Sequence, residues 1–202
     1  MNGSGPKYGL LMFLIVGLSL GLTSFEGEEL ESIAAIEVKE TADASFDKMM
    51  QVITHKRCMN CHPAGNVPRQ GEDSHLHHFA VQRGEEGNGL EAYTCNTCHQ
   101  DENNNYSGAP GAPHWALAPA SMSWEGKSRV EIATSIMDPS RNGGRNATQI
   151  LKHLTEDELV LWAWEPGVNG EGDARELPPV SKEEWIAAVK NWIAAGAVIP
   201  AQ

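Results

Sequence analysis

Residues 58–62 read Cys-Met-Asn-Cys-His, and residues 95–99 read Cys-Asn-Thr-Cys-His. Both segments have the pattern C-x-x-C-H, and together they contain all four cysteines of the 202-residue chain. Thiols three residues apart on one helical turn lie on the same face, where they can add to the two vinyl groups of one porphyrin. The pattern is the attachment signature of c-type haem. We therefore predict two covalently bound haem c groups.

Each motif assigns a role to its histidine as well. His62 and His99 directly follow the second cysteine of their pairs and are the predicted proximal iron ligands. Two C-x-x-C pairs could instead bind one zinc ion through four thiolates, or form disulfides. Neither alternative explains why a histidine follows both pairs. The predicted thioether cysteines are Cys58, Cys61, Cys95 and Cys98.

A low-spin haem also needs a distal histidine or methionine. Met122 lies in a proline-bearing loop, residues 118–124, of the kind that presents a thioether to iron; the alternative is a methionine that fills core space. A His/Met haem would have a higher potential than a His/His haem beside it, giving electrons a preferred direction. The distal candidates are His75, Met122, His77 and His153, whereas His55, His78, His114 and Met137 are expected to have other roles.

Helix signals surround the two motifs. Residues 45–57 are compatible with a helix that leads into the first motif. The pattern S/T-x-x-E predicts helix starts at Ser128, Thr155 and Ser181. The last helix, residues 182–195, has a stripe of tryptophan, isoleucine and valine, and glycine follows its end. No alternating strand pattern is convincing, so we predict an all-α fold with long loops, in which cytochrome c-like helices wrap around two haems.

The long loops, 63–94 and 100–127, are unusual for a small domain. Each porphyrin would add a large apolar surface against which such loops can pack. The first cysteines of the two motifs are only 37 residues apart, which is too short for two complete single-haem domains. We therefore expect residues 45–202 to form one domain that carries both haems.

The first residues have the pattern of an export signal. Lys7 precedes an uncharged, mostly apolar run over residues 8–25. We interpret residues 1–24 as a signal peptide or, alternatively, an uncleaved N-terminal membrane anchor, and residues 25–44 as an acidic linker. Covalent haem c is assembled outside the cytoplasm in bacteria, so the two signals agree. A periplasmic or otherwise exported location is expected.

Charge limits the choice of partner. Lys and Arg number 15 against 27 Asp and Glu, a formal net charge of -12. Such a surface repels phosphate backbones, so nucleic acid is not an expected partner. It would instead be attracted to a redox protein with a basic docking patch. Two of the few basic residues, Arg141 and Arg145, are candidates for pairing with haem propionates, or are ordinary surface charges.

Several segments resemble a known family. In chain order these are RCMNCHPAG (57–65), EDSHLHHF (72–79), NTCHQ (96–100), GAPHWALAPASMSWEG (111–126), DPSRNGGR (138–145) and LVLWAWEPG (159–167). Over residues 56–200 the chain resembles a family of exported dihaem c-type cytochromes labelled "isoquinoline 1-oxidoreductase subunit". Residues 58–100 also resemble the dihaem subunit of periplasmic nitrate reductase, and that resemblance implies a distal ligand at His75.

Together these features lead us to expect an electron-transfer protein, or the electron-transfer subunit of a periplasmic oxidoreductase, rather than an enzyme. The alternative is a dihaem enzyme of the peroxidase type, which requires one open iron site with acid or base groups beside it. Known dihaem peroxidases are longer and give each haem its own domain.

Overall fold

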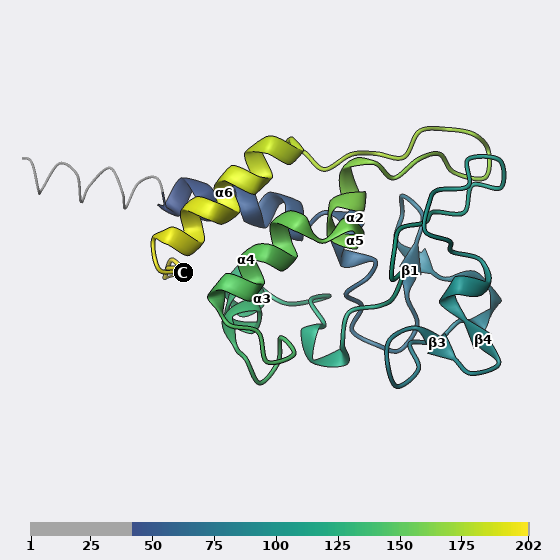
Figure 1. The fold of residues 1–202 in the computed structure, drawn as a ribbon, viewed down its shortest axis with the longest axis horizontal. Helices are drawn as coiled ribbons and strands as arrows, with labels where there is room; N and C mark the ends of the chain where they lie inside the picture. The colour runs from purple at the N-terminus through teal and green to yellow at the C-terminus, as the bar shows by residue number, and fades with distance from the viewer. Residues whose placement is uncertain (1–41, 202) are drawn as a thin grey trace, which may run out of the picture. The chain divides into compact units, whose positions relative to one another are not determined.

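The computed structural model describes residues 42–201, so the predicted signal peptide or anchor and residues 25–41 of the predicted linker lie outside the described residues (Figure 1). Residues 42–44, assigned above to the linker, are helical, and Ala42 is buried. The helix before the first motif therefore includes residues that we had placed in the linker. Among residues 42–201, no helix is long and apolar enough to cross a membrane.

The helix before the first motif is interrupted at a position that the sequence did not indicate. Residues 42–53 are helical, and a short second helix, α2 (Lys56–Met59), begins after a break, where the prediction had one helix over 45–57. His55 causes the second start: its backbone is extended, and its side chain accepts a hydrogen bond from the Arg57 amide as an N-cap. Histidine is not among the usual capping residues, so the break was not predicted.

Four further helices follow both motifs: α3 (Arg129–Met137), α4 (Ala147–Glu156), α5 (Glu158–Leu161) and α6 (Lys182–Ala194). Ser128 and Ser181 start α3 and α6 with complete capping boxes, as predicted. The predicted start at Thr155 is wrong, because Thr155 lies inside α4 and its hydroxyl donates to the Leu151 carbonyl. The third capping box belongs to Asn146, which starts α4.

The long loops contain only short regular segments. Four strands of two residues form two antiparallel pairs, β1 with β2 and β3 with β4. Their bounds are Arg69–Gln70 (β1), His75–Leu76 (β2), Gly89–Leu90 (β3) and Tyr93–Thr94 (β4). The 3-10 turns are His78–Ala80 (η1), Cys95–Thr97 (η2), Ala120–Met122 (η3) and Trp162–Trp164 (η4). The fold among the described residues is thus helical with two minimal β-ladders.

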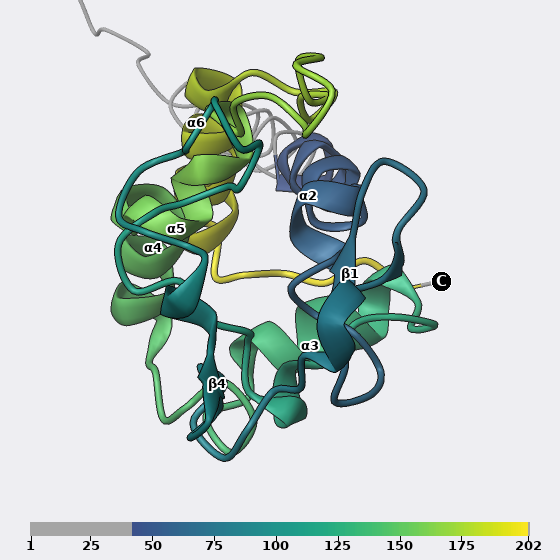
Figure 2. The same cartoon turned by 90° about the vertical axis from the view of Figure 1, so that its right-hand side faces the viewer.

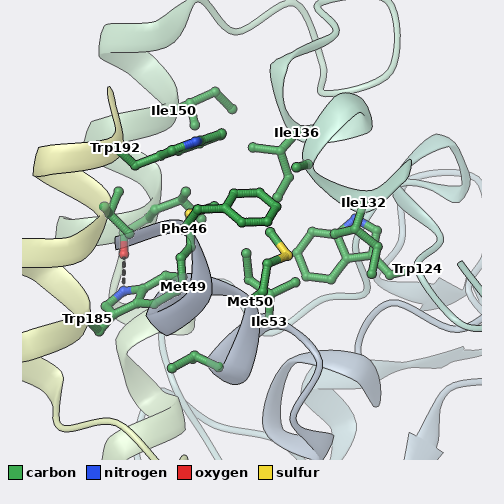
Figure 3. Close-up of a cluster of buried hydrophobic side chains, with 14 of the residues drawn as sticks. Phe46, Met49, Met50, Ile53, Trp124, Ile132, Ile136, Ile150, Trp185 and Trp192 are labelled. Carbon is green, nitrogen blue, oxygen red and sulfur yellow. Dashed lines mark hydrogen bonds between the residues drawn. The ribbon is translucent and has the colours of Figure 1, made fainter. Parts of the chain in front are cut away.

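The hydrophobic core lies between the helices (Figure 3). The helical residues 42–53, α3, α4 and α6 all contribute apolar side chains to it. Trp185 and Trp192 of α6 are almost completely buried, and their ring N–H groups donate to the carbonyls of Leu154 and Val198. Both α6 indoles therefore keep a hydrogen bond, and the predicted apolar stripe of α6 is confirmed at these two positions.

The two motifs lie beside this core rather than inside it. Helices α3, α4 and α6 gather on one side of the described part of the chain, and the β-ladders and loops gather on the other (Figures 1 and 2). Cys58 and Met59 of the first motif pack against the edge of the core. The described residues, 42–201, belong to one unit by their mutual contacts, and both motifs lie in it.

Candidate haem-attachment site

Each motif forms a single helical turn. In the first, the Cys61 amide donates to the Cys58 carbonyl at 3.1 Å, and the His62 amide donates to the Met59 carbonyl at 3.0 Å. In the second, the Cys98 and His99 amides both donate to the Cys95 carbonyl, at 3.2 and 3.0 Å. The three-residue spacing of each cysteine pair is therefore realised as one turn, which is the local geometry that attachment of one porphyrin requires.

The imidazoles of His62 and His99 are held in the same way, by two carbonyls of the loop 100–127. His62 Nδ1 lies 2.6 Å from the Met122 carbonyl oxygen, and His99 Nδ1 lies 2.7 Å from the Pro110 carbonyl oxygen. A carbonyl can only accept, so Nδ1 carries the proton in both rings and Nε2 keeps its lone pair. Iron-binding histidines need this tautomer, because a second-shell acceptor at one nitrogen fixes the other for the metal.

A tryptophan ring stacks on each of these imidazoles. Trp124 lies parallel to His62, with ring centres 3.4 Å apart and planes 6° apart. Trp115 stacks on His99 with ring centres 4.6 Å apart and planes 10° apart. The stacking partner and the Nδ1 acceptor together fix the orientation of both rings. The histidines of both motifs therefore have the same arrangement of neighbours, and the loop 100–127 supplies it in each case.

Burial keeps both imidazoles neutral. It lowers the pKa of His62 to about 3, against the hydrogen bond to the Met122 carbonyl, which acts to raise it. It lowers the pKa of His99 too, again opposed by the hydrogen bond to a backbone carbonyl. A neutral imidazole is the form that binds iron, so neither ring has to lose a proton near neutral pH.

None of the four cysteines is paired in a disulfide in this structure. Burial raises the pKa of Cys58 to about 12 and that of Cys61 to about 11. Cys95 contributes to the rise at Cys61, so the two motifs lie close together. Among residues 42–201, no group of three or more histidine, cysteine, aspartate or glutamate side chains is arranged to hold a bare metal ion.

His77 lies close to the histidine of the second motif. Its ring centre lies 6.1 Å from that of His99, with 70° between the planes. Two imidazoles that bind one metal from opposite sides, through metal–nitrogen bonds of about 2 Å, have ring centres roughly 6 Å apart. His77 Nδ1 donates to the His78 carbonyl at 2.8 Å, so its Nε2 also keeps a lone pair.

His75, the candidate implied by the nitrate reductase resemblance, uses both ring nitrogens elsewhere. Its Nδ1 lies 2.5 Å from Asp73 Oδ1, and its Nε2 lies 3.1 Å from Gln70 Nε2. The side chain is fixed between neighbours on and beside the β1–β2 ladder. His75 would have to break a hydrogen bond before it could bind iron, whereas His77 would not.

His153 lies near the histidine of the first motif. The positive charge that His153 can carry contributes to the lowered pKa of His62. On α4, His153 Nδ1 lies 3.0 Å from Asp157 Oδ2, one turn later, which leaves Nε2 without a hydrogen-bond partner in the part of the chain that the structure describes. A carboxylate at Nδ1 is a common second-shell partner of a metal-binding histidine.

The Met122 backbone carbonyl faces Nδ1 of His62, whereas iron would bind at Nε2. The Met122 side chain is buried in the hydrophobic core, with 8% of its surface exposed. The placement favours the core-packing interpretation over ligation.

The remaining residues with predicted roles fall outside this arrangement. His78 and His114 are exposed, as expected, and Met137 packs at the edge of the core. His55 caps α2 and contacts Glu176. Arg145 donates to the Asn142 carbonyl of its own loop, and the Arg141 carbonyl accepts from Ser121. Neither arginine makes an ion pair with an acidic side chain in residues 42–201.

Polar groups around the first motif test whether a haem fits there. Three buried side chains have polar atoms with no hydrogen-bond partner in the described residues: Asn60 Oδ1, the indole N–H of Trp124, and Nε and Nη1 of Arg83. Asn60 is part of the first motif, Trp124 stacks on His62, and Arg83 donates to the Pro63 carbonyl. Three unpaired N–H groups beside an attachment motif suit a porphyrin with two carboxylates.

The second motif borders a cavity of about 440 Å³, within the range of small-molecule sites. Its walls combine the rings of His99, Trp115 and His114 with small apolar residues and the carboxylates of Glu86 and Asp101. Sequence reasoning missed Arg83, Trp115 and Trp124 as parts of the site. Their signal is weak, because a lone arginine or tryptophan in a loop is common, and only the fold brings them to the motifs.

Comparisons with protein-family models, with curated proteins and with solved structures each found no match for this chain.

Proposed function

We propose that the chain is an exported dihaem c-type cytochrome that carries electrons between redox partners, possessing no catalytic site of its own. One observation supports this most strongly: both motif histidines have Nδ1 on a backbone carbonyl and a tryptophan stacked on the ring. Zinc binding or disulfide formation by the cysteines would leave this repeated arrangement without a purpose. Haem ligation explains it.

The axial ligands follow from the placements of the other histidines. We assign His99 and His77 to the iron of the second haem, and His62 and His153 to the iron of the first. Each of the four has Nδ1 occupied and Nε2 left for a metal, within the described residues. Haem with two strong axial ligands supplies a reversible one-electron couple. Because neither iron keeps an open position in this assignment, it favours electron transfer over the peroxidase alternative.

The closeness of the motifs supports transfer within the molecule. Cys95 is near enough to Cys61 to contribute to the raised pKa of the Cys61 thiol, and both motifs lie in one unit of the chain. Two haems attached there would be neighbours. An electron could then enter at one haem and leave at the other, toward a partner with a basic patch that fits the acidic surface.

The resemblance to exported cytochromes and the pattern of residues 1–24 support a periplasmic location, with the uncleaved anchor as the alternative. Cleavage of the N-terminal segment can be measured directly. The mass and N-terminal sequence of the protein recovered from the periplasm, compared with the membrane fraction, separate the two forms.

Expression in a bacterial host that matures c-type cytochromes tests the central proposal. The expected product is red, with an intact mass that exceeds the polypeptide by two haems. Replacing Cys58 and Cys61 with alanine should remove one haem, and replacing Cys95 and Cys98 should remove the other. A colourless product with four free thiols, from a host that matures a control cytochrome, would refute the proposal. High-spin iron with turnover of peroxide would favour the peroxidase alternative.

A further inference from the structure

Arg83 is buried in the loop that connects the two motifs along the chain. Only 5% of its surface is exposed. Its backbone amide donates to the Asn66 carbonyl at 2.6 Å, and its carbonyl accepts from the Gly89 amide at 2.9 Å, so its backbone connects the beginning and the end of this loop. Its Nη2 donates to the Gly65 carbonyl at 3.0 Å and approaches the Pro63 carbonyl at 3.4 Å. The guanidinium is therefore held against the residues that directly follow His62.

This guanidinium has no counter-charge among the described residues. Its Nε and Nη1 are buried without an acceptor, and no carboxylate of residues 42–201 pairs with it. Arg57 is buried to the same degree, with 6% exposed, but contacts the Glu72 carboxylate and the Glu176 carbonyl. A buried charge without a partner is costly, so it is normally paired with an opposite charge.

The position of Arg83 indicates which anion it takes. Its guanidinium contacts the carbonyls of Pro63 and Gly65, which directly follow the first motif. The two unpaired N–H groups, Nε and Nη1, can donate to a carboxylate. The carboxylates that a haem brings to this place are its propionates.

We propose that Arg83 binds a propionate of the haem attached at Cys58 and Cys61, and thereby raises the potential of that haem relative to the other. This inference rests on the proposed function. Arg83, rather than Arg141 or Arg145, is then the anchoring arginine. A positive charge held beside a haem favours the reduced, less positive state, so its removal lowers the midpoint potential of that haem.

The test compares the mature full chain with Arg83→Gln, Arg83→Lys and the control Arg145→Gln, a half-exposed arginine bound to its own loop. Haem content is measured first, by intact mass. Potentiometric titration then gives the two midpoint potentials, and resonance Raman spectra report the propionate bending bands.

Arg83→Gln is expected to keep two haems, to lower one midpoint potential and to shift one propionate band, while Arg145→Gln changes neither. Arg83→Lys keeps the positive charge but has fewer hydrogen-bond donors. We therefore expect its propionate band to shift, while its midpoint potential falls less than that of Arg83→Gln. A doubly haem-loaded Arg83→Gln protein with unchanged potentials and bands would overturn the inference. If the Arg83→Gln protein does not accumulate, unchanged propionate bands in Arg83→Lys would likewise overturn the inference. Wild-type protein without haem would instead contradict the proposed function.

Discussion

At the scale of single residues, the state of Nε2 separates the histidines that we propose as iron ligands from His75. His77 and His99 each donate Nδ1–H to a backbone carbonyl and keep Nε2. His75 is only two residues from His77, but both of its ring nitrogens have partners. In the proposed assignment, an Nε2 left without a partner, rather than proximity in the chain, decides which histidine binds iron.

Replacement of His77 by alanine should leave the iron of the second haem without its distal ligand. We expect the variant to retain two covalent haems and to lose about half of its low-spin iron signal in electron paramagnetic resonance, since only one of two irons changes. His75→Ala is the matched control and should retain the wild-type spectrum. The reverse result, a high-spin iron in His75→Ala and none in His77→Ala, would show that His75 is the ligand.

The sequence was sufficient to predict both motifs and their histidines, because attachment chemistry fixes the spacing of those residues. It could not choose among the distal candidates. A distal ligand needs only to reach the iron, so its place in the chain is set by how the loops fold. Met122 illustrates the limit: its proline-bearing loop favours ligation, but the structure places its carbonyl at His62 Nδ1 and its side chain in the core.

At the scale of helices, the start of α4 shows how a sequence pattern can be correct in type and wrong in place. The pattern at Thr155 and Glu158 matches a capping box, but Thr155 lies in the last turns of α4. The observed capping box is formed by Asn146 and Gln149, whose side-chain amides take the places of the hydroxyl and the carboxylate. Both positions satisfy the local rule, but Thr155 is still helical, and the helix after it, α5, starts instead with Asp157, whose side chain accepts from the Leu159 amide.

Asn146→Ala should destabilise the protein by about 1 kcal/mol, because the Gln149 amide loses its acceptor at the start of α4. Asn146→Asp keeps an acceptor at the same place and is the control, with a much smaller expected effect. Denaturant unfolding of the mature protein, followed by far-ultraviolet circular dichroism, measures both. Equal stability of Asn146→Ala and wild type would mean that the cap contributes nothing to α4.

At the scale of the whole described unit, charged side chains join distant segments at α2. Lys56 and Arg57 both contact Glu72, which lies in the loop after the first motif. Lys56 also contacts Glu176, which lies in the loop between η4 and α6, at 2.8 Å. Three parts of the chain thus meet beside the first haem motif. None of these pairs follows a helical spacing, so the sequence did not predict them.

Glu72→Gln should weaken this junction in a pH-dependent manner. Burial acts to raise the pKa of Glu72, but Arg57 and Lys56 outweigh it and hold the pKa below its ordinary 4.5. The unfolded chain therefore binds a proton at higher pH than the folded protein does. The contribution of Glu72 is complete above pH 4.5 and is lost as the pH falls through the lower folded value.

At pH 7 we expect Glu72→Gln to cost about 1 kcal/mol, a modest value because the Glu72 side chain is 43% exposed. At an acidic pH below the lowered folded pKa of Glu72, the difference from wild type should nearly vanish. Urea unfolding at the two pH values measures it, with Glu91→Gln, an exposed glutamate on the loop between β3 and β4, as the control. A deficit that stays constant with pH would indicate a packing effect rather than an ion pair.

The net charge of -12 predicts how the whole molecule associates with a partner. An acidic protein attracts a basic partner over a distance set by the ionic strength, about 30 Å at 0.01 M salt and about 10 Å at 0.1 M. If electrons pass to such a partner, the second-order rate of transfer measured by stopped flow should fall at least tenfold over this range. Reduction by a neutral small molecule supplies the control and should be unaffected. A transfer rate with the basic partner that does not respond to salt would show that charge plays no part in docking, and that the partner recognises some other surface.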